Sequence, residues 1–298
     1  MVTVNAPAKI NLTIEVIGKR PDGYHEIRSV IQTVTLCDTL HFTAVDRTEF
    51  RSSSTGWSAE LSLVSKAVQL VKESTGYRGG VNVEVEKRIP LMAGLGGDSS
   101  DGAAVLMGLD RLWGLKLSRD RLLELAAKLG SDVAFFLHGG TALMEGRGEK
   151  IMPLPALPRQ YVVLVNPAIA RSPGKTAAVF AALKPSHFTD GTITERLVQN
   201  LRAGRDFTPS HVFNTFENVV FTPGAELTTY RSHIRKIGAP HVSLAGSGSA
   251  LFTLLKDKAR AEDLATRLRN QDMETYLVET GNCDQPTVGT GGKPFLRI

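Results

Sequence analysis

Residues 87–103, KRIPLMAGLGGDSSDGA, form the stretch that decides the fold of this chain. Three valines alternate over residues 81–85 just before it, and this period of two predicts a strand. Apolar residues at helical spacing follow over 103–113 and predict a helix. A strand, a glycine-rich turn and a helix start together form an anion cradle, because glycine lets the backbone approach a ligand closely and unpaired N–H groups point outward from the helix start. The plainer alternative is a tight turn in which Ser99 or Ser100 caps the helix.

Two common nucleotide-binding loops do not fit this chain. The dinucleotide fingerprint needs a third glycine at the position of Ser99. The tripeptide Gly174-Lys175-Thr176 looks like the end of a P-loop, but Ile169 stands where that loop requires its first glycine. Without that glycine the backbone cannot wrap around phosphates, so we exclude a P-loop.

The stretch 90–103 resembles the central motif of the GHMP small-molecule kinases, P-x-x-x-G-L-G-(G)-x-S-S. Two more stretches match motifs of the same family in the expected order: PAKINL at 7–12 resembles the first motif, and AGSGSA at 245–250 resembles the third. The resemblance covers about residues 5–280, and on it the chain is identified as a member of this family.

Other stretches are similar to one branch of the family, whose acceptor is cytidine-diphospho-methylerythritol. They are RPDGYH at 20–25, LGSDVAFF at 129–136 and FNTFEN at 213–218, together with PAKINL. The resemblance implies transfer of the γ-phosphoryl group of ATP to the 2-hydroxyl of that alcohol, in the non-mevalonate route to isoprenoid precursors. Two alternatives stay open: another GHMP kinase, acting on homoserine or mevalonate, and a catalytically silent binding protein of the same fold.

The resemblance also supplies an α+β architecture. It implies a ribosomal S5 domain 2-like N-terminal domain, a ferredoxin-like C-terminal α/β sandwich, and an active site in the cleft between them. We place the domain boundary in the proline-rich segment 153–158, which gives domains over 1–155 and 156–280. The remaining residues, 281–298, are rich in glycine and turn formers and predict an irregular tail.

Apolar periodicity supplies a coarse set of secondary elements. The predicted strands lie over 3–17, 26–45, 161–166 and 275–279, with a strand–loop–strand over 242–255. The predicted helices begin near residues 61, 119, 175, 224 and 257, and Ser118 and Gly130 are the expected caps of the second one.

Phosphoryl transfer to an alcohol needs a proton acceptor and a cation near the reacting oxygen. The resemblance assigns the base to Asp132 and the cation to Lys9. Taken alone, Asp132 at the start of an apolar turn is typical of a helix N-cap, and Lys9 on a half-buried strand is typical of a solvated lysine. A lysine beside the aspartate would keep the carboxylate ionised and neutralise developing charge.

The resemblance places the ATP phosphates on the central loop, which consists of Pro90, Leu91, Met92, Ala93, Gly94, Leu95, Gly96, Gly97, Asp98, Ser99 and Ser100. Magnesium is expected with ATP, and its protein ligands are not assigned.

The acceptor site would contain aromatic and polar residues from two regions of the chain. Tyr24 and Phe180 are expected to stack on cytosine, and His25 to hydrogen-bond the base edge. Asn11 is expected to orient the erythritol hydroxyls, while Thr176 shares one face of a short helix with Phe180. For Phe180 the alternative is plain core packing.

Four positions depart from the family pattern. Met92 and Asp98 stand where glycines are usual, and Gly102 stands where alanine is usual. A carboxylate beside phosphates is repulsive unless it binds magnesium or points outward, so Asp98 is the unusual one. Ser62 occupies a helix start where an asparagine commonly holds adenine, so no adenine contact is assigned.

Composition fits an enzyme of this kind. The chain has 298 residues, of which 42% are hydrophobic and 22% are charged, as in ordinary globular proteins. Its net charge of +5 comes from scattered basic residues, which disfavours nucleic acid as a partner and suits small anionic ligands. No apolar run reaches membrane-spanning length. Cys37 and Cys283 form no metal-binding pattern, and we expect a reducing cytoplasm; the oligomeric state is not assigned.

Overall fold

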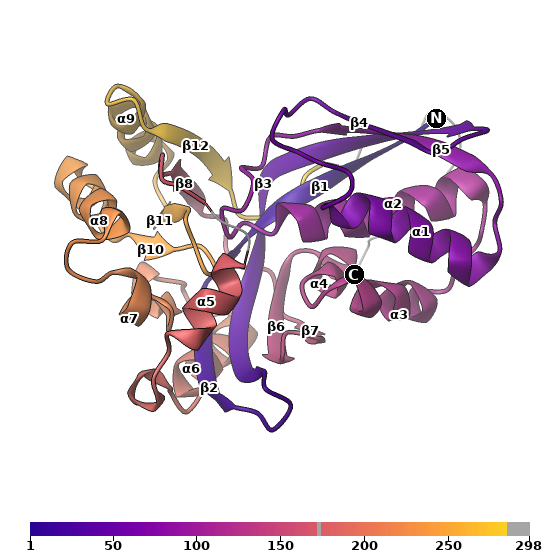
Figure 1. The fold of residues 1–298 in the computed structure, drawn as a ribbon. Coiled ribbons are helices and arrows are strands. Elements are labelled where there is room, and N and C mark those ends of the chain that lie inside the picture. Colours follow the sequence, from indigo (N-terminus) through magenta and orange to yellow (C-terminus); the bar gives the residue numbers. More distant parts are fainter. Residues whose placement is uncertain (172–173, 285–298) are drawn as a thin grey trace.

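The computed structural model describes residues 1–171 and 174–284. Within these ranges the chain forms a sheet of eight strands and a second, antiparallel sheet of four strands. Figure 1 shows helices α1–α4 gathered on one side of the long strands β1 and β3, with α8 and α9 beside the smaller sheet. The mixed helices and sheets confirm the predicted α+β class.

The strands of the larger sheet come mostly from the first half of the chain. They are β1 (Val2–Asn11), β2 (Thr13–Lys19), β3 (His25–Val45), β4 (Glu49–Ser52), β5 (Gly80–Glu86), β6 (Thr141–Gly146), β7 (Lys150–Pro153) and the short β9 (Phe213–Asn214). The smaller sheet has the order β10-β11-β8-β12 and consists of β8 (Tyr161–Asn166), β10 (Ser243–Leu244), β11 (Leu251–Leu255) and β12 (Glu274–Glu279).

The helices pack against these two sheets. They are α1 (Leu63–Thr75), α2 (Gly97–Trp113), α3 (Arg119–Leu129), α4 (Val133–His138), α5 (Lys175–Ala181), α6 (Thr192–Arg202), α7 (Glu217–Val220), α8 (Glu226–Ile237) and α9 (Lys258–Arg269). Local sequence fixes several of their ends. The Ser118 hydroxyl accepts a hydrogen bond from Arg121 N at the start of α3, and Gly130 follows its last residue, as predicted. Ser62 caps α1 in the same way, by accepting from Val64 N.

Strand β3 organises the larger sheet. Its 21 residues pair in turn with β2, β6, β1 and β5, all antiparallel. The register of β1 against β3 shifts between Pro7 and Ala8. This bulge lies immediately before the segment that carries Lys9.

The buried core is continuous between the two sheets. One apolar cluster joins Ala8 and Ile10 of β1 to Leu164 of β8 and Phe252 of β11. The same cluster contains Ala93, Leu95, Ala245 and Ala250 from the two glycine-rich loops. The loops are therefore held where the two sheets meet.

Some predicted elements needed correction. The strand expected over 3–17 is two strands, β1 and β2, which separate at Leu12. Helix α6 lies outside the predicted helices, although Thr194, Leu197, Val198 and Leu201 form a buried stripe at helical spacing. Strands β4, β6, β7 and β9 were also not predicted. Strands β4, β7 and β9 have two to four residues, too few for a periodic pattern, and the six residues of β6 were missed.

The domain boundary placed at 155/156 stays a prediction. Strand β7 ends at Pro153 in the larger sheet, and β8 begins at Tyr161 in the smaller one. Residues 285–298 of the predicted tail lie outside the described residues. Within 281–284, the Asn282 side-chain oxygen accepts hydrogen bonds from Thr33 Oγ1 (2.8 Å) and Gly140 N (2.9 Å), so this part of the tail is anchored.

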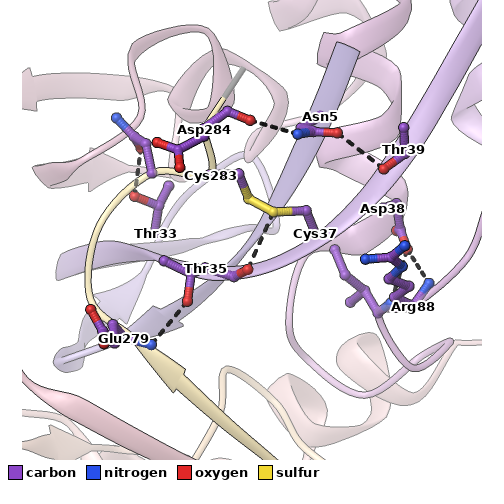
Figure 2. The surroundings of a disulfide bond; sticks show 12 residues. Asn5, Thr33, Thr35, Cys37, Asp38, Thr39, Arg88, Glu279, Cys283 and Asp284 are labelled. Atoms are coloured by element: carbon purple, nitrogen blue, oxygen red, sulfur yellow. Dashed lines mark hydrogen bonds between the residues drawn. A yellow bond between two sulfur atoms is a disulfide. The ribbon is translucent and has the colours of Figure 1, made fainter. Parts of the chain in front are cut away.

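A disulfide also anchors the end of the described chain. Figure 2 shows Cys37 on β3 bonded to Cys283, which follows β12. The two residues are 246 positions apart, with their Cα atoms 6.6 Å from each other. Their separation in the sequence had given no indication of this pairing.

No helix within residues 1–171 and 174–284 is both long and apolar enough to span a membrane.

Candidate active site

The three glycine-rich or lysine-bearing motifs meet through backbone hydrogen bonds. Lys9 N donates to Leu95 O (2.9 Å), and Ala250 N donates to Ala93 O (2.9 Å). Between them, a Cβ atom on Gly94 would lie 2.1 Å from Ala245 O. Only glycine permits this approach, so Gly94 lets the central loop and the third loop (residues 245–250) pack against each other.

Helix α2 begins inside the central loop. Its N-cap is Gly96, with φ of 73° and no side-chain capping bond, so the alternative in which a serine caps this helix is wrong. The first intrahelical bond runs from Ser100 N to Gly96 O, and the preceding amide hydrogens have no intrahelical acceptor. Ser100 Oγ is buried with no hydrogen-bond partner in the described structure. These donors and this hydroxyl have the geometry of an anion site.

Lys9 and Asp132 lie close together beside this loop. Lys9 Nζ is 3.8 Å from Asp132 Oδ2, and it donates a 2.7 Å hydrogen bond to Asn11 Oδ1. Lys9 is only 5% exposed, and burial lowers the pKa of its ammonium while Asp132 acts in the opposite direction. Asp132 occupies the N-cap position of α4 but makes no capping hydrogen bond. The side chain is therefore not used as a helix cap.

Both ends of the Asn11 side-chain amide bond to protein groups. Besides accepting from Lys9, its amide donates through Nδ2 to Ser29 Oγ (2.9 Å), and Ser29 Oγ donates to Thr13 O (2.5 Å). This chain of bonds fixes the Lys9 ammonium. The predicted contact between Asn11 and acceptor hydroxyls stays a prediction.

The residues expected to hold cytosine fall into two groups. His25 and Phe180 stack on each other, with ring centroids 5.0 Å apart and an interplanar angle of 23°. Phe180 also meets the edge of Phe216 (4.8 Å), so it packs partly on the C-terminal core. Tyr24 is 57% exposed, and the Arg147 guanidinium lies 4.7 Å from its ring centroid. The structure thus brings His25 and Phe180 together and leaves Tyr24 accessible.

Thr176 lies on the same helix as Phe180 but contacts the third loop. Its Oγ1 is 2.8 Å from Ser247 Oγ, within hydrogen-bond distance. Helix α5 therefore joins the third loop at one end to the His25–Phe180 pair at the other.

The departures from the family pattern have structural reasons. Asp98 Oδ1 accepts hydrogen bonds from Ser62 Oγ (2.6 Å) and Leu63 N (3.0 Å), so this oxygen caps the start of α1. A Cβ on Gly102 would lie 3.3 Å from Leu63 Cβ, which shows how closely α2 approaches α1. Met92 has φ of 52°, a conformation that favours the glycine usual at this position.

A buried ionic cluster behind the central loop was not predicted. Lys87 Nζ bonds to Asp38 Oδ2 (2.5 Å) and Asp101 Oδ2 (2.7 Å), and Asp38 Oδ1 accepts from Arg88 N and Ile89 N. Burial and the neighbouring Asp38 raise the pKa of Asp101 well above its usual value. The cluster joins β3, the end of β5 and α2. Its sequence signal is weak, because Asp101 lies two residues before the apolar pattern that predicts the helix.

Two residues of the FNTFEN stretch hold the third loop. Asn214 Nδ2 donates to Leu244 O (3.0 Å) and Gly246 O (2.8 Å), while Glu217 Oε1 accepts from Leu244 N (2.9 Å). Both side chains also line a cavity of about 530 Å³ beside Arg231. The motif had marked this stretch without giving it a role, and the structure makes it the support of the third loop.

No three His, Cys, Asp or Glu side chains in the described part of the chain are grouped to hold a metal ion.

Comparison with known proteins agrees with this arrangement. The model of the GHMP kinases N terminal domain matches residues 62–140, and that of the GHMP kinases C terminal matches residues 197–274. A 4-diphosphocytidyl-2-C-methyl-D-erythritol kinase from Dehalococcoides mccartyi is 49% identical over 280 residues, covering 94% of this chain and 98% of its own length.

Solved structures show the same relationship. The crystal structure of a 4-(cytidine 5'-diphospho)-2C-methyl-D-erythritol kinase superposes with a TM-score of 0.79 at 34% identity, covering 94% of this chain and 99% of its own. A homoserine kinase from Cytophaga hutchinsonii shares the fold, with a TM-score of 0.67 at 18% identity and 94% of each chain covered. The chain belongs to the GHMP kinase family, and within it to the 4-diphosphocytidyl-2-C-methyl-D-erythritol kinases.

Proposed function

We propose that this chain transfers the γ-phosphoryl group of ATP to the 2-hydroxyl of 4-diphosphocytidyl-2-C-methyl-D-erythritol, giving the 2-phosphate and ADP in the non-mevalonate pathway. The observation that carries the proposal is the convergence of Lys9 and Asp132, 3.8 Å apart, on the loop that carries the unpaired amides of α2. The near full-length similarity to kinases of that name supports the choice of acceptor.

In this proposal Asp132 accepts the proton of the attacking hydroxyl. Its carboxylate is about one third exposed, so an acceptor can reach it, and it is not committed to capping α4. Lys9 supplies positive charge from a buried position, where electrostatic interactions are stronger than in water. Asn11 holds the ammonium in place through the 2.7 Å bond, so the cation needs no reorganisation during transfer.

The ATP phosphates would bind the loop from Pro90 to Ser100. The amides at the start of α2 donate to phosphate oxygens, and the unpaired Ser100 Oγ suits either a phosphate oxygen or a magnesium ion. Magnesium bound with ATP would neutralise phosphate charge. Asp98 is occupied by Ser62 and Leu63 through one carboxylate oxygen, so we do not assign it as the main metal ligand.

The acceptor base would lie by His25, Phe180 and Tyr24. Burial and the nearby Lys19 lower the pKa of His25, so the ring is neutral at pH 7 and offers one donor and one acceptor to a base edge. Tyr24 is 57% exposed, and it would stack on the base through the ring face opposite Arg147. Thr176, near the start of α5, would offer its hydroxyl to the acceptor as a hydrogen-bonding group.

The alternatives predict different substrates or none. A homoserine- or mevalonate-type kinase would phosphorylate an acceptor without the cytidine diphosphate group, and a silent binding protein would consume no ATP. We also propose a cytoplasmic location, because the cofactor and the acceptor are both small anionic metabolites. The Cys37–Cys283 disulfide differs from what the sequence led us to expect, since such bonds are rare in a reducing compartment.

The test is an ATP-consumption assay with purified chain and a panel of alcohols that includes the cytidine-diphospho alcohol, homoserine and mevalonate. We expect turnover with the cytidine-diphospho alcohol alone. Turnover with homoserine or mevalonate, or no turnover with any alcohol, would contradict the proposal.

A further inference from the structure

Lys175, at the start of α5, has a buried ammonium without an anion. Its Nζ is shielded from solvent and makes no hydrogen bond to any described residue. A Cβ on Gly248 would lie 3.2 Å from this nitrogen, so the ammonium rests against the third loop. A buried cation is costly unless it is paired, and structures normally satisfy such groups.

A second cationic side chain nearby, Arg171, has one N–H group without a partner. Arg171 donates through Nη1 to Leu91 O (2.6 Å) and through Nη2 to Asn166 Oδ1, but its Nε is buried and unbonded. Burial, and secondarily the charge of Arg171, lower the pKa of Lys175 to about 8. Two like charges are therefore held near each other, and neither forms an ion pair with a carboxylate in the described residues.

The position of Lys175 along α5 indicates which anion fits. Phe180, at the far end of this helix, stacks on His25, and five residues of helix span about 7.5 Å. The third loop, which Lys175 contacts at Gly248, also approaches Lys9: a Cβ on Gly246 would lie 3.1 Å from Lys9 Nζ. Lys175 thus stands between the proposed cytosine-binding pair and the proposed site of transfer.

In a cytidine-diphospho alcohol the diphosphate lies between the base and the reacting hydroxyl. We infer that Lys175, assisted by the free Nε of Arg171, binds the diphosphate of the acceptor through hydrogen bonds to its non-bridging oxygens. This inference rests on the proposed function for the nature of the acceptor. It assigns a ligand to the stretch Gly174-Lys175-Thr176, which resembles the end of a P-loop but lacks that loop's first glycine.

Binding measurements with cytidine 5'-diphosphate and cytidine test whether Lys175 binds the diphosphate. Calorimetry would compare cytidine 5'-diphosphate with cytidine on wild-type protein, on Lys175→Gln and on Lys175→Arg. We expect Lys175→Gln to lower the affinity for cytidine 5'-diphosphate about tenfold or more, and the affinity for cytidine less than threefold. Lys175→Arg should recover part of the loss, because it keeps the charge. Lys236→Gln, the same change on an exposed face of α8, is the matched control and should bind as the wild type.

Kinetics and stability complete the test. In turnover assays Lys175→Gln should raise KM for the acceptor and leave KM for ATP within twofold. Removing an unpaired buried charge should leave the urea midpoint of the free protein equal or higher, whereas a lysine with a structural role would lower it. An unchanged affinity for cytidine 5'-diphosphate, or a loss confined to ATP, would overturn the inference. Failure of the wild type to phosphorylate the alcohol would instead count against the proposed function, because the nucleotide-binding comparison does not depend on turnover.

Discussion

The Lys9 ammonium is bonded more closely to Asn11 than to Asp132: Nζ lies 2.7 Å from Asn11 Oδ1 and 3.8 Å from Asp132 Oδ2. The amide fixes the cation, and the carboxylate stays near it without being locked in a short ion pair. This arrangement leaves the aspartate available to an acceptor hydroxyl, and it sets the expected behaviour of several variants.

Asp132→Asn should lower kcat by a factor on the order of 100 or more, since a general base typically contributes that much. ATP should still bind, because the phosphate-binding amides of α2 are unchanged. Single-turnover kinetics and nucleotide binding by calorimetry measure the two effects. Asp120→Asn, an exposed change on α3, is the control. A variant with near wild-type turnover would move the base away from Asp132.

The pH profile of kcat should report Lys9. Burial lowers the pKa of this ammonium from its ordinary value of 10.5, so the charged form is complete at low pH and is lost on the alkaline side earlier than for an exposed lysine. We therefore expect kcat at saturating substrates to fall as pH rises toward 10. Asp132 raises this pKa, so the residual activity of Asp132→Asn should fall at a lower pH than that of the wild type. Coincident alkaline limbs for the two proteins would argue against a charged Lys9 in the reaction.

Phe180→Leu and His25→Ala should act on the acceptor only. Loss of base stacking should weaken binding of the acceptor by about 1–3 kcal/mol. The loop that binds ATP lies on other elements and is unchanged. The measurement is KM for both substrates in each variant. If KM for ATP rises instead, the cytidine site has been placed on the wrong side of the active site.

Gly94→Ala should damage the site in a way that Gly224→Ala does not. Both glycines have φ of 83°, so an alanine at either position should cost about 1–2 kcal/mol in the free energy of unfolding. Only at Gly94 would the new Cβ press on Ala245 O, whereas no atom lies within 4 Å at Gly224. Urea unfolding should show a larger stability loss for Gly94→Ala than for Gly224→Ala, because only the former forces a backbone contact apart. The value of kcat/KM should fall at least tenfold for Gly94→Ala alone. Equal activities would show that the contact between the two loops is dispensable.

The disulfide should make stability depend on redox conditions. It closes a loop of 246 residues, for which chain entropy predicts a stabilisation of about 5 kcal/mol at most. Oxidised protein should therefore unfold at a higher urea midpoint than protein treated with dithiothreitol, and Cys37→Ser should abolish the difference. Two thiols titrating in protein that has been mildly oxidised would contradict the pairing.

Local sequence determined the elements that carry the site. The valines of 81–85, the glycines of the central loop and the apolar residues of α2 predicted the strand, the turn and the helix in the right order, because each depends on neighbours within a few residues. Ser118 and Gly130 marked the ends of α3 for the same reason. The family motifs then named Lys9 and Asp132 as a pair, which the fold places 3.8 Å apart.

Tertiary structure alone decided what each polar side chain does. The Asp98 carboxylate caps α1 because Ser62 and Leu63 offer it two donors. The Asn11 amide donates to Ser29, which lies on the neighbouring strand β3. The ammonium of Lys175 lacks a partner only because α5 packs beside the third loop, some seventy residues away in the chain. Such contacts join residues far apart in sequence, so they depend on how the two sheets pack together, and no local periodicity encodes them.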